Sequence, residues 1–393
     1  MDILISGAGI AGLTSAHWLR RYGFNPTIVE RAGSLVVGGY KIDVRGTALD
    51  VLRRMGALDA VIASSTHMQG AKLVDRDGNV IGELGGDEFG HRVGDDLEIV
   101  RGTLCEILLA QATGIDVMYG DVIESITQSP DSAEVTFRNA DARTFDLVLG
   151  ADGLHSNVRQ LAFGDESQFL RDLGMYLCVY SVPNYLQLDR TEMQYSEVGR
   201  VAAIWATRDD PAAKACFGFA EASQQIDLRD RGQQEDALRS VYAGIGWEVP
   251  RLLELMPEAT DWYFDVAAQV DLAEFGRGRV ALVGDAGYCA SPMSGQGSSL
   301  ALIGAYVLAG ELAAASGDHQ AAFAEYDRVM RPFVITNQQL GIESAKFMTQ
   351  DPEAAPADLS GSEIESHIDR STQSITEAAN AITLKDYSAY TRA

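Results

Sequence analysis

The first residues of the chain carry a glycine pattern that could hold the phosphates of a dinucleotide. Gly7, Gly9 and Gly12 follow the spacing G-x-G-x-x-G. Ile10 and Ala11 lie between the last two glycines. The first glycine permits a tight turn, the second lets a pyrophosphate approach the backbone, and the third lets a helix pack closely on a strand. Free N–H groups at the start of such a helix bind phosphate oxygens.

An acidic residue follows at the spacing expected for a ribose contact. The run Asp2–Ser6 predicts a buried strand before the glycines, and Leu13–Arg21 predicts a helix after them. A second strand, Thr27–Val29, ends at Glu30, whose carboxylate could bind the hydroxyls of an adenosine ribose. The alternative, a surface glutamate after a glycine-rich turn, is weaker because strand, turn, helix, strand and acid all agree. This motif alone does not separate FAD from NAD.

Two further motifs lie far along the chain, each after an apolar run that predicts a buried strand. The second motif, at 146–159, reads DLVLGADGLHSNVR and contains Asp152 and Gly153. The third motif begins with Gly284 and Asp285, continues to Tyr288, and is followed by Pro292, Gly295, Gln296 and Gly297. The nucleotide-binding layer is therefore expected to combine the N-terminus, the middle and the segment near Asp285.

Composition excludes several classes of protein. The 393 residues carry a net charge of −25, which would repel nucleic acid and anionic membranes, so we predict a partner of neither kind. The four cysteines, Cys105, Cys178, Cys216 and Cys289, form no C-x-x-C pair. That spacing argues against zinc, iron–sulfur and dithiol redox chemistry, and we predict no metal site.

The chain is predicted to be cytoplasmic, with free thiols. No basic region precedes the first apolar run, and glycines interrupt that run, so it does not resemble a signal peptide. The longest apolar segment, Leu300–Ala315, contains Gly304, Gly310 and Glu311, and we interpret it as a buried helix.

Hydrophobic periodicity predicts alternating helices and strands in the first 163 residues. They comprise a helix over Leu49–Leu58 that ends near Gly56, a hairpin over Leu73–Ile81 with its turn at Asp77 and Gly78, a strand over Leu97–Arg101, a helix over Thr103–Ala112 with Thr103 as its cap, and paired strands over Val117–Ile126 and Glu134–Phe137.

From about Phe163 to Val270 the pattern indicates an antiparallel sheet with one covered face. Its predicted strands are Tyr176–Val182, Thr191–Tyr195, Val201–Ala206 and Ala215–Ala220, with helices over Asp236–Ala243 and Pro250–Met256. Later helices are expected over Gln320–Leu340 and Glu363–Ala379, with a loop over Thr349–Ser362 between them. Ligand clefts commonly form between two domains, so we expect one between the nucleotide-binding layer and this sheet-rich insertion.

Together the three motifs resemble the class A FAD-dependent aromatic monooxygenases of the para-hydroxybenzoate hydroxylase type, from Ile3 to about Arg331. The resemblance implies an α/β fold: a Rossmann-like FAD-binding domain of the glutathione-reductase type, an inserted antiparallel-sheet substrate domain and C-terminal helices. The expected FAD-binding domain is discontinuous, at 1–66, 95–163 and 271–345. The substrate domain is expected at 67–94 and 164–270, and a helical segment at 346–393.

The resemblance also implies FAD contacts for particular residues. Asp285 would contact the ribityl or pyrophosphate region, and Pro292 with Gly295–Gly297 would lie beside the flavin ring. Asp152 and Gly153 would serve the pyrophosphates of both FAD and NADPH, while Arg101 and Arg31 would contact FAD. Many relatives have histidine where this chain has Tyr288. A histidine role therefore cannot be carried over.

One segment resembles the flavin-facing segment of tetracycline-inactivating monooxygenases. It reads GGYKIDVRG at 38–46 and would place Asp43, with Arg45, near the isoalloxazine. The alternative is a β-turn with scattered surface charge. Antibiotic-tailoring hydroxylases share the segment, so the substrate does not follow from it.

The implied reaction uses NADPH, or NADH, to reduce FAD, and O2 to form a flavin C4a-hydroperoxide. One oxygen atom then passes to an electron-rich carbon of an aromatic, phenolic, enolic or polyketide substrate. No side chain is assigned as catalytic, because the flavin performs the chemistry. Candidates for lining the substrate site, each of which also suits a core position, are Met193, Tyr195, Trp205, Phe217 and Phe219. His67 and His91 are possible polar contacts, and the protein is expected to be a monomer or a homodimer.

Several alternatives remain open at this stage. Baeyer–Villiger insertion begins from the same flavin peroxide as hydroxylation. A protein that holds FAD and sequesters a ligand without turnover would carry the same motifs. A flavin-dependent reductase of isoprenoid double bonds is disfavoured by the acidic composition. A flavin-dependent halogenase requires a Trp-x-Trp-x-Ile-Pro segment, which the spacing of Trp18, Trp205, Trp247 and Trp262 does not provide.

Overall fold

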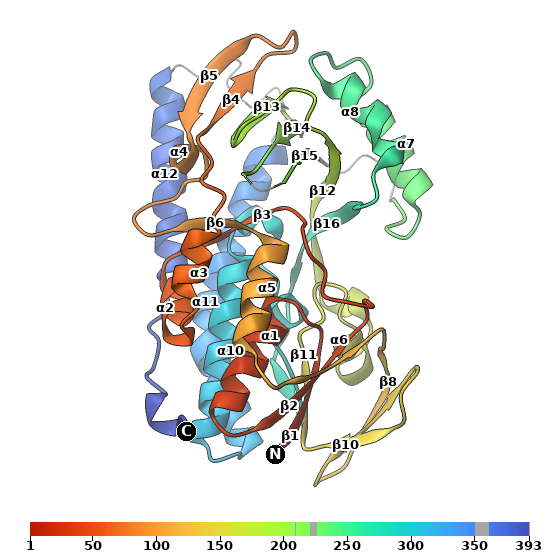
Figure 1. Cartoon of the computed structure of the whole chain (residues 1–393), viewed down its shortest axis with the longest axis vertical. Helices are drawn as coiled ribbons and strands as arrows, with labels where there is room; N and C mark the ends of the chain where they lie inside the picture. The colour runs from red at the N-terminus through yellow and green to blue at the C-terminus, as the bar shows by residue number, and fades with distance from the viewer. Residues whose placement is uncertain (209, 221–225, 350–360, 393) are drawn as a thin grey trace.

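The computed structural model describes residues 1–208, 210–220, 226–349 and 361–392. Figure 1 shows an elongated molecule with two halves. Its lower half holds β1, β2, α1 and α10, and its upper half holds the strands from β12 to β16. Both ends of the chain lie at the lower end.

A mainly parallel sheet forms the centre of the lower half. Its strand order is β17-β18-β11-β1-β2-β7, and only β17 runs antiparallel to its neighbour. Residues Ile3 to Ile5 are fully buried, as expected for a parallel strand covered on both faces. The strands are β1 (Asp2–Ser6), β2 (Asn25–Glu30), β7 (Asp116–Tyr119), β11 (Leu147–Gly150), β17 (Gly276–Arg277) and β18 (Val280–Leu282).

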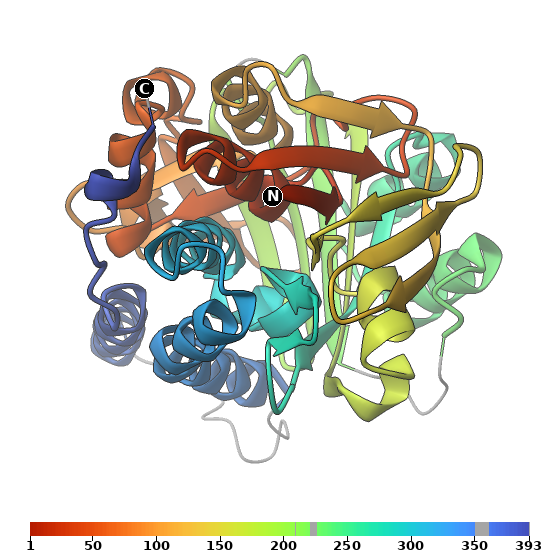
Figure 2. The ribbon, with the colours of Figure 1, turned by 90° about the horizontal axis from the view of Figure 1, so that it is seen from below.

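Helices cover one side of this sheet and a small antiparallel sheet covers the other (Figure 2). The helices are α1 (Ile10–Arg21), α5 (Arg101–Gln111), α10 (Gly297–Ala314) and α11 (His319–Thr349), and the small sheet contains β8 (Ile123–Gln128), β9 (Ala133–Phe137) and β10 (Arg143–Phe145). Among the described helices, α10 is the one long and apolar enough to cross a membrane by length and composition. Of that apolar stretch, 83% is buried inside the fold, so α10 packs as a core helix.

The upper half is built on a seven-stranded sheet of order β16-β12-β15-β14-β13-β4-β5. Only the pair β13 and β4 is parallel. Helices α7 (Arg231–Val241) and α8 (Val249–Leu255) lie against one face of it (Figure 1). The strands are β4 (Gly70–Val74), β5 (Val80–Gly85), β12 (Leu170–Pro183), β13 (Thr191–Glu197), β14 (Arg200–Trp205), β15 (Ala212–Ala220) and β16 (Tyr263–Val270).

A short antiparallel pair, β3 (Lys41–Val44) and β6 (Leu97–Val100), completes the set of sheets. The remaining helices are α2 (Thr47–Met55), α3 (Leu58–Ala63), α4 (Gly86–Phe89), α6 (Asn157–Ala162), α9 (Asp285–Tyr288) and α12 (Gly361–Ala379), with 3-10 turns η1 (Glu166–Gln168), η2 (Met256–Glu258), η3 (Pro292–Ser294) and η4 (Ser388–Tyr390). Most of the predicted loop over Thr349–Ser362 lies outside the described residues.

Several predicted elements differ in their bounds: the helix expected over Asp236–Ala243 is Arg231–Val241, and the helix expected over Gln320–Leu340 is His319–Thr349. The helix expected over Leu49–Leu58 does end near Gly56, because Gly56 adopts a left-handed φ of 77° and ends α2. It begins earlier than expected, at Thr47, and Leu58 belongs to the next helix, α3. The strand expected over Val117–Ile126 is split between two sheets near Gly120, where φ is 73°.

The helix expected to begin with a Thr103 cap begins earlier, at Arg101. No side chain caps it. Instead the N–H of Arg101 donates to Tyr40 O, and the N–H of Gly102 donates to Gly38 O. Carbonyls of the preceding loop therefore accept the first two N–H groups of the helix.

Candidate active site

The glycine motif forms a tight crossing between β1 and α1. A Cβ atom on Gly12 would lie 1.9 Å from the carbonyl oxygen of Gly7, so no larger residue fits without a shift. Gly7 has a φ of 103°. Gly9 is the N-cap of α1 and makes no side-chain capping bond, which leaves the first-turn N–H groups, including those of Ile10 and Ala11, available to an anion.

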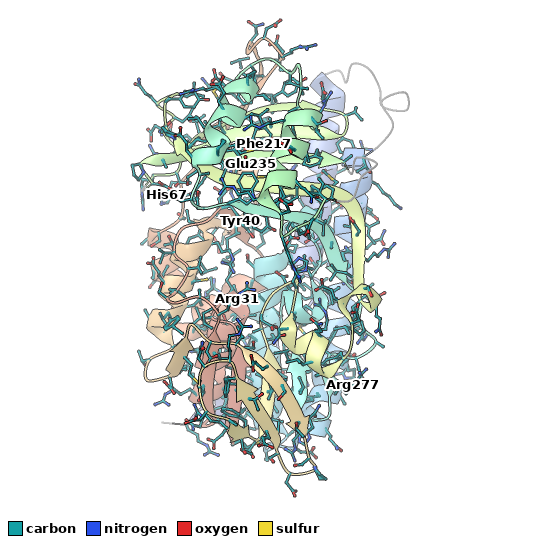
Figure 3. The ribbon with its side chains drawn as sticks, turned by 90° about the vertical axis from the view of Figure 1, so that its right-hand side faces the viewer. Arg31, Tyr40, His67, Phe217, Glu235 and Arg277 are labelled. Atoms are coloured by element: carbon teal, nitrogen blue, oxygen red, sulfur yellow. The ribbon has the colours of Figure 1, made fainter. Side chains whose placement is uncertain are left out.

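Glu30 lies beside this crossing with a fixed side chain. One carboxylate oxygen accepts the N–H of Ala8 at 2.8 Å, and the other accepts the N–H of Ala32 at 2.8 Å. A carboxylate has about four acceptor positions, so both oxygens can still accept ribose hydroxyls. Arg31 is exposed in the lower half (Figure 3).

The third motif meets the first motif at close range. Gly284 has a φ of 66°, and a Cβ atom on it would lie 2.9 Å from Ala11 Cβ. The Asp285 carboxyl follows at the start of α9, and burial raises its pKa, which Arg101 opposes. In the described part of the chain, the Arg101 guanidinium makes no hydrogen bond or ion pair, and its Nη2 lies 3.4 Å from where a Cβ on Gly9 would be.

The residues after Asp285 present unpaired polar atoms. Gln296 is completely buried, and neither its side-chain oxygen nor its side-chain nitrogen has a hydrogen-bond partner. An unsatisfied buried group of this kind costs about 1–3 kcal/mol, so it points to a ligand that supplies the missing bonds. Pro292 begins a 3-10 turn, Gly295 has a φ of 63°, and α10 begins at Gly297 without a side-chain cap.

These features together fit FAD. The glycine crossing leaves room for a pyrophosphate, and Glu30 suits a ribose. The buried Gln296 amide and the start of α10 suit the polar edge of the flavin ring.

Asp152 is engaged in local structure. Its carboxylate accepts the N–H of Val158 at 3.0 Å and the hydroxyl of Ser156, and it lies 3.4 Å from the hydroxyl of Ser6. It therefore stabilises the start of α6 and fixes that segment to β1. Burial raises its pKa. Gly153, next to it, has a φ of 83° and open space beside its Cα.

Tyr288 is a core residue. It is fully buried, and its hydroxyl accepts a hydrogen bond from Tyr326 at 2.8 Å. Burial raises its pKa above the usual value. Tyr288 therefore faces the interior of the lower half.

Asp43 and Arg45 lie at the end of β3 in an ion-pair cluster. The two side chains are 2.8 Å apart, and burial raises the pKa of Asp43. Arg45 also donates to the carbonyls of Gly90 at 2.6 Å and His91 at 2.7 Å. Arg45 therefore holds the 90–91 loop through its two Nη atoms, while its buried Nε has no hydrogen-bond partner.

The two histidines singled out from the sequence lie away from the glycine crossing. His91 contacts Thr372 of α12 at 2.9 Å, through its ring Nδ1. The His67 ring lies 3.0 Å from the Ser65 hydroxyl, in a residue with a φ of 49°.

The predicted substrate residues lie on two different faces of the seven-stranded sheet. Glu192 pairs with Lys41 of β3, so its face of the sheet looks toward the lower half. Trp205 lies directly opposite Glu192 in the antiparallel pair and shares that face. The other four candidates, Met193, Tyr195, Phe217 and Phe219, face the α7 and α8 layer. The structure therefore brings only Trp205 of the five to the side of the cofactor residues.

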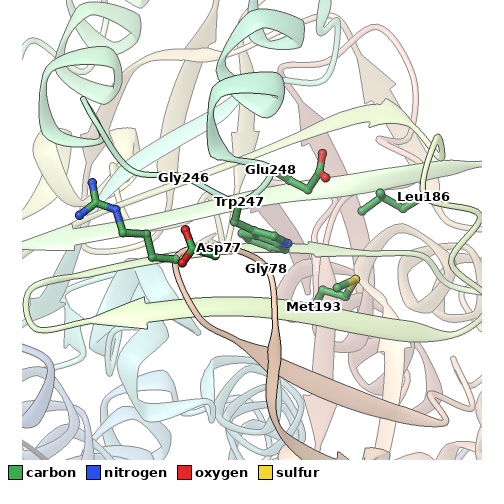
Figure 4. Close-up of a pocket in the computed structure, with 8 residues that line it drawn as sticks. Asp77, Gly78, Leu186, Met193, Gly246, Trp247 and Glu248 are labelled. Carbon is green, nitrogen blue, oxygen red and sulfur yellow. The ribbon is translucent and has the colours of Figure 1, made fainter.

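Met193 instead lines a pocket on the opposite face, with a volume of about 450 Å³ (Figure 4). This pocket lies between the β4–β5 turn and the start of α8. Its lining residues are Arg76, Asp77, Gly78, Leu186, Met193, Gly246, Trp247 and Glu248.

Sequence reasoning missed two tyrosines where the halves meet. The rings of Tyr40 and Tyr263 have centroids 5.3 Å apart, and burial raises the pKa of both hydroxyls. Figure 3 places Tyr40 at the junction. Tyr40 lies inside the GGYKIDVRG segment, which was the available signal, whereas Tyr263 had none because only the folded sheet brings it there.

Sequence reasoning also missed a histidine that joins the halves. His155, in the second motif, lies 2.9 Å from Glu166 and 3.1 Å from Asp265 of β16. Hydrogen bonding to Asp265, with a further bond to Glu166, raises its pKa to about 9.

Comparison with known proteins agrees with this geometry. Residues 1–336 match the family described as FAD binding domain. A flavin-dependent monooxygenase of an unknown prokaryotic organism is 44% identical over 386 residues, which cover 98% of each chain.

Two solved structures are similar along the whole chain. Tetracycline destructase Tet(55) is 42% identical with a TM-score of 0.90, and the match covers 98% of each chain. Tetracycline destructase Tet(51) is 37% identical with a TM-score of 0.88, covering 98% of this chain and 99% of its own. The cofactor of such enzymes is FAD, with a nicotinamide nucleotide as the typical reductant. The chain belongs to the class A FAD-dependent monooxygenases.

Proposed function

We propose that this enzyme oxygenates a polycyclic phenol or enol of the tetracycline class, with NADPH and O2 as co-substrates. The observation that supports the substrate class is the full-length similarity to two tetracycline destructases. The match extends through the seven-stranded sheet as well as through the nucleotide-binding sheet. Similarity restricted to the cofactor half would support only the shared chemistry.

The residues that would hold FAD come from three parts of the chain. The glycine crossing and the first turn of α1 would bind the pyrophosphate, and Glu30 with Arg31 would bind the adenosine end. Arg101, Asp285 and the Gln296 amide would contact the ribityl and ring region. Pro292, Gly295 and Gly297 would shape the backbone beside the ring, and Asp152 with Gly153 would serve the pyrophosphates of FAD and NADPH.

The protein's own task is to orient the substrate and keep water away. Bound FAD supplies the redox chemistry, which is reduction by NADPH and activation of O2. The first turn of α10 presents unpaired N–H groups and a partial positive charge, which stabilise developing negative charge near its end. Trp205 offers an aromatic surface to the substrate from the facing sheet.

The division of the chain into domains follows the same proposal. The FAD-binding part would comprise 1–66, 95–163 and 271–345, and the substrate part 67–94 and 164–270, with a helical segment at 346–393. The pairing of β4 with β13 supports joining 67–94 to the later insertion. We also propose that the enzyme acts in the cytoplasm, as a monomer or a homodimer.

The test is aerobic NADPH oxidation by the FAD-loaded protein, with and without tetracycline, with product mass read from the same reaction. The proposal expects stimulated oxidation and a product that has gained one oxygen atom. Stimulation with only peroxide released would mean that tetracycline binds and uncouples, and would contradict the substrate assignment. Binding without stimulation would instead identify a sequestering protein.

A further inference from the structure

A cluster of charged side chains is buried between β3 and the seven-stranded sheet. Each of its seven members has a side chain that is at most 20% exposed. Three are cations and four are anions: Lys41, Arg45, Arg92, Asp43, Asp96, Glu98 and Glu192.

Lys41 connects three separate strands within this cluster. Its ammonium lies 2.8 Å from Glu192 of β13 and 3.2 Å from Glu98 of β6. It also lies 5.6 Å from the ring centroid of Trp205 and 5.9 Å from that of Phe89. Burial opposes its charge, but the two carboxylates raise the pKa of Lys41 above the usual value, so it remains an ammonium.

A cluster of buried charges often stabilises a fold less than apolar side chains in the same space would. Asp43 lies directly opposite Glu98 in the β3–β6 pair, an arrangement of like charges that is destabilising by itself. Arg92 bridges the two carboxylates at 3.3 and 3.0 Å. What the charges add is a defined geometry, because each ion pair holds only at one separation of the strands.

These ion pairs fix the position of β3, on the cofactor side, relative to β13, on the substrate side. Strand β3 carries Asp43 and belongs to the segment next to the proposed flavin site. Strand β13 carries Glu192, which faces the same way as Trp205 on β14. The N–H of Arg45, at the end of β3, donates to the Ser299 hydroxyl in the first turn of α10. The pair between Lys41 and Glu192 therefore links a strand that contacts the proposed flavin site to the sheet that would present the substrate.

We propose that Lys41, acting through Glu192, is a positioning residue that sets the distance and register of the substrate sheet over the flavin strand. This inference rests on the proposed function for its catalytic consequence, although not for its structural one. Without the ion pair, FAD still binds, since none of its proposed contacts is lost. The substrate is then presented less accurately, and more NADPH is consumed per oxygenated product.

The experiment compares Glu192→Gln and Lys41→Met with a matched control, Lys72→Met. Lys72 pairs with Glu83 at 3.8 Å in the same sheet, but these side chains are 45% and 66% exposed. Three quantities are measured on each full-length protein: the dissociation constant for FAD by flavin fluorescence, amide hydrogen exchange in β3 and β13, and product formed per NADPH consumed. Lys41→Arg serves as the conservative rescue.

The expected result has three parts. The FAD dissociation constant stays the same, exchange in β3 and β13 rises in Glu192→Gln and Lys41→Met but not in Lys72→Met, and product per NADPH falls about tenfold. A fall of that size is reasonable because a misplacement of about 1 Å can cost about 10²-fold in rate. Lys41→Arg recovers much of the lost coupling, which a loss of bulk stability would not predict.

Unchanged exchange in β3 and β13 would overturn the proposal, whatever the activity. Raised exchange with undiminished product per NADPH would also overturn it. Failure of the wild-type enzyme to oxygenate tetracycline would contradict the proposed function separately. In that case the exchange data alone decide the positioning role: raised exchange in β3 and β13 of Glu192→Gln supports it, and no rise overturns it.

Discussion

The hydroxyl of Tyr326 donates a hydrogen bond to the hydroxyl of Tyr288 at 2.8 Å, in the interior between α9 and α11. Tyr326 also lies 3.1 Å from the carbonyl oxygen of Leu282. The absence of a side chain at Gly304 makes this arrangement possible, because a Cβ atom there would lie 1.8 Å from the Tyr288 hydroxyl. Tyr288 is thus accommodated by a glycine on the neighbouring helix.

Replacing Tyr326 with phenylalanine should lower the free energy of unfolding by about 1–3 kcal/mol, because the buried Tyr288 hydroxyl loses its hydrogen-bond partner. Urea unfolding of the protein would measure the change. Tyr390→Phe, at a side chain that is 41% exposed, is the control and should have no effect. Equal stability of Tyr326→Phe and the wild type would argue against the hydrogen bond.

Gly12→Ala should abolish FAD binding or folding, since its Cβ would lie 1.9 Å from the Gly7 carbonyl oxygen. The shift needed to relieve that contact moves α1 away from β1 and opens the phosphate crossing. Flavin content after purification and reconstitution measures the loss. Gly33→Ala, where no atom lies within 4 Å of the added Cβ, should keep full flavin content. A fully loaded Gly12→Ala protein would contradict the proposed pyrophosphate site.

Trp205→Leu should weaken substrate binding by about tenfold, equivalent to about 1.4 kcal/mol. The indole faces the side of the cofactor residues, whereas Tyr195 faces the layer of α7 and α8. Tyr195→Phe should therefore leave binding unchanged. Quenching of flavin fluorescence during tetracycline titration provides the dissociation constants. A stronger effect at Tyr195 than at Trp205 would show that the substrate occupies the other face of the sheet.

The contact of His155 with Asp265 should make stability depend on pH. Its pKa is raised to about 9 in the folded protein against 6.5 for a free histidine. The contribution is therefore fully present below about pH 6.5 and is lost as pH rises through about 9. Its size should not exceed about 1 kcal/mol, because the side chain is 43% exposed.

Unfolding free energies of wild type and His155→Gln, measured from pH 6 to pH 10, would test this. The wild type should be the more stable of the two at the acidic end, and the difference should vanish at the alkaline end. A difference that grows with pH would have the wrong sign for a protonated histidine between two carboxylates.

The sequence predicted the cofactor half well because its signals are local. Gly7 and Gly12 lie close together in the sequence and pack against each other. The short apolar runs before each motif correspond to β1, β11 and β18. The convergence of the three motifs followed from the parallel order of those strands. The boundaries that the sequence did not predict are set by tertiary contacts, such as the start of α5 at Arg101, where carbonyls of the preceding loop accept the first N–H groups of the helix.

The substrate side was harder to predict because facing depends on strand register. Alternation shows that Met193 and Glu192 point in opposite directions, but not which of them faces the flavin. That was settled only by Lys41, which lies about 150 residues earlier and reaches Glu192 in the fold. Long-range ion pairs of this kind leave no periodic trace in a sequence.

The most direct test of the central claim is product mass after turnover of the FAD-loaded enzyme with NADPH and tetracycline under isotopically heavy O2. The account predicts a product that carries one heavy oxygen atom, with the second oxygen atom of O2 appearing in water. A product whose added oxygen comes from the solvent, or the release of peroxide with unmodified tetracycline, would contradict oxygenation of this substrate class.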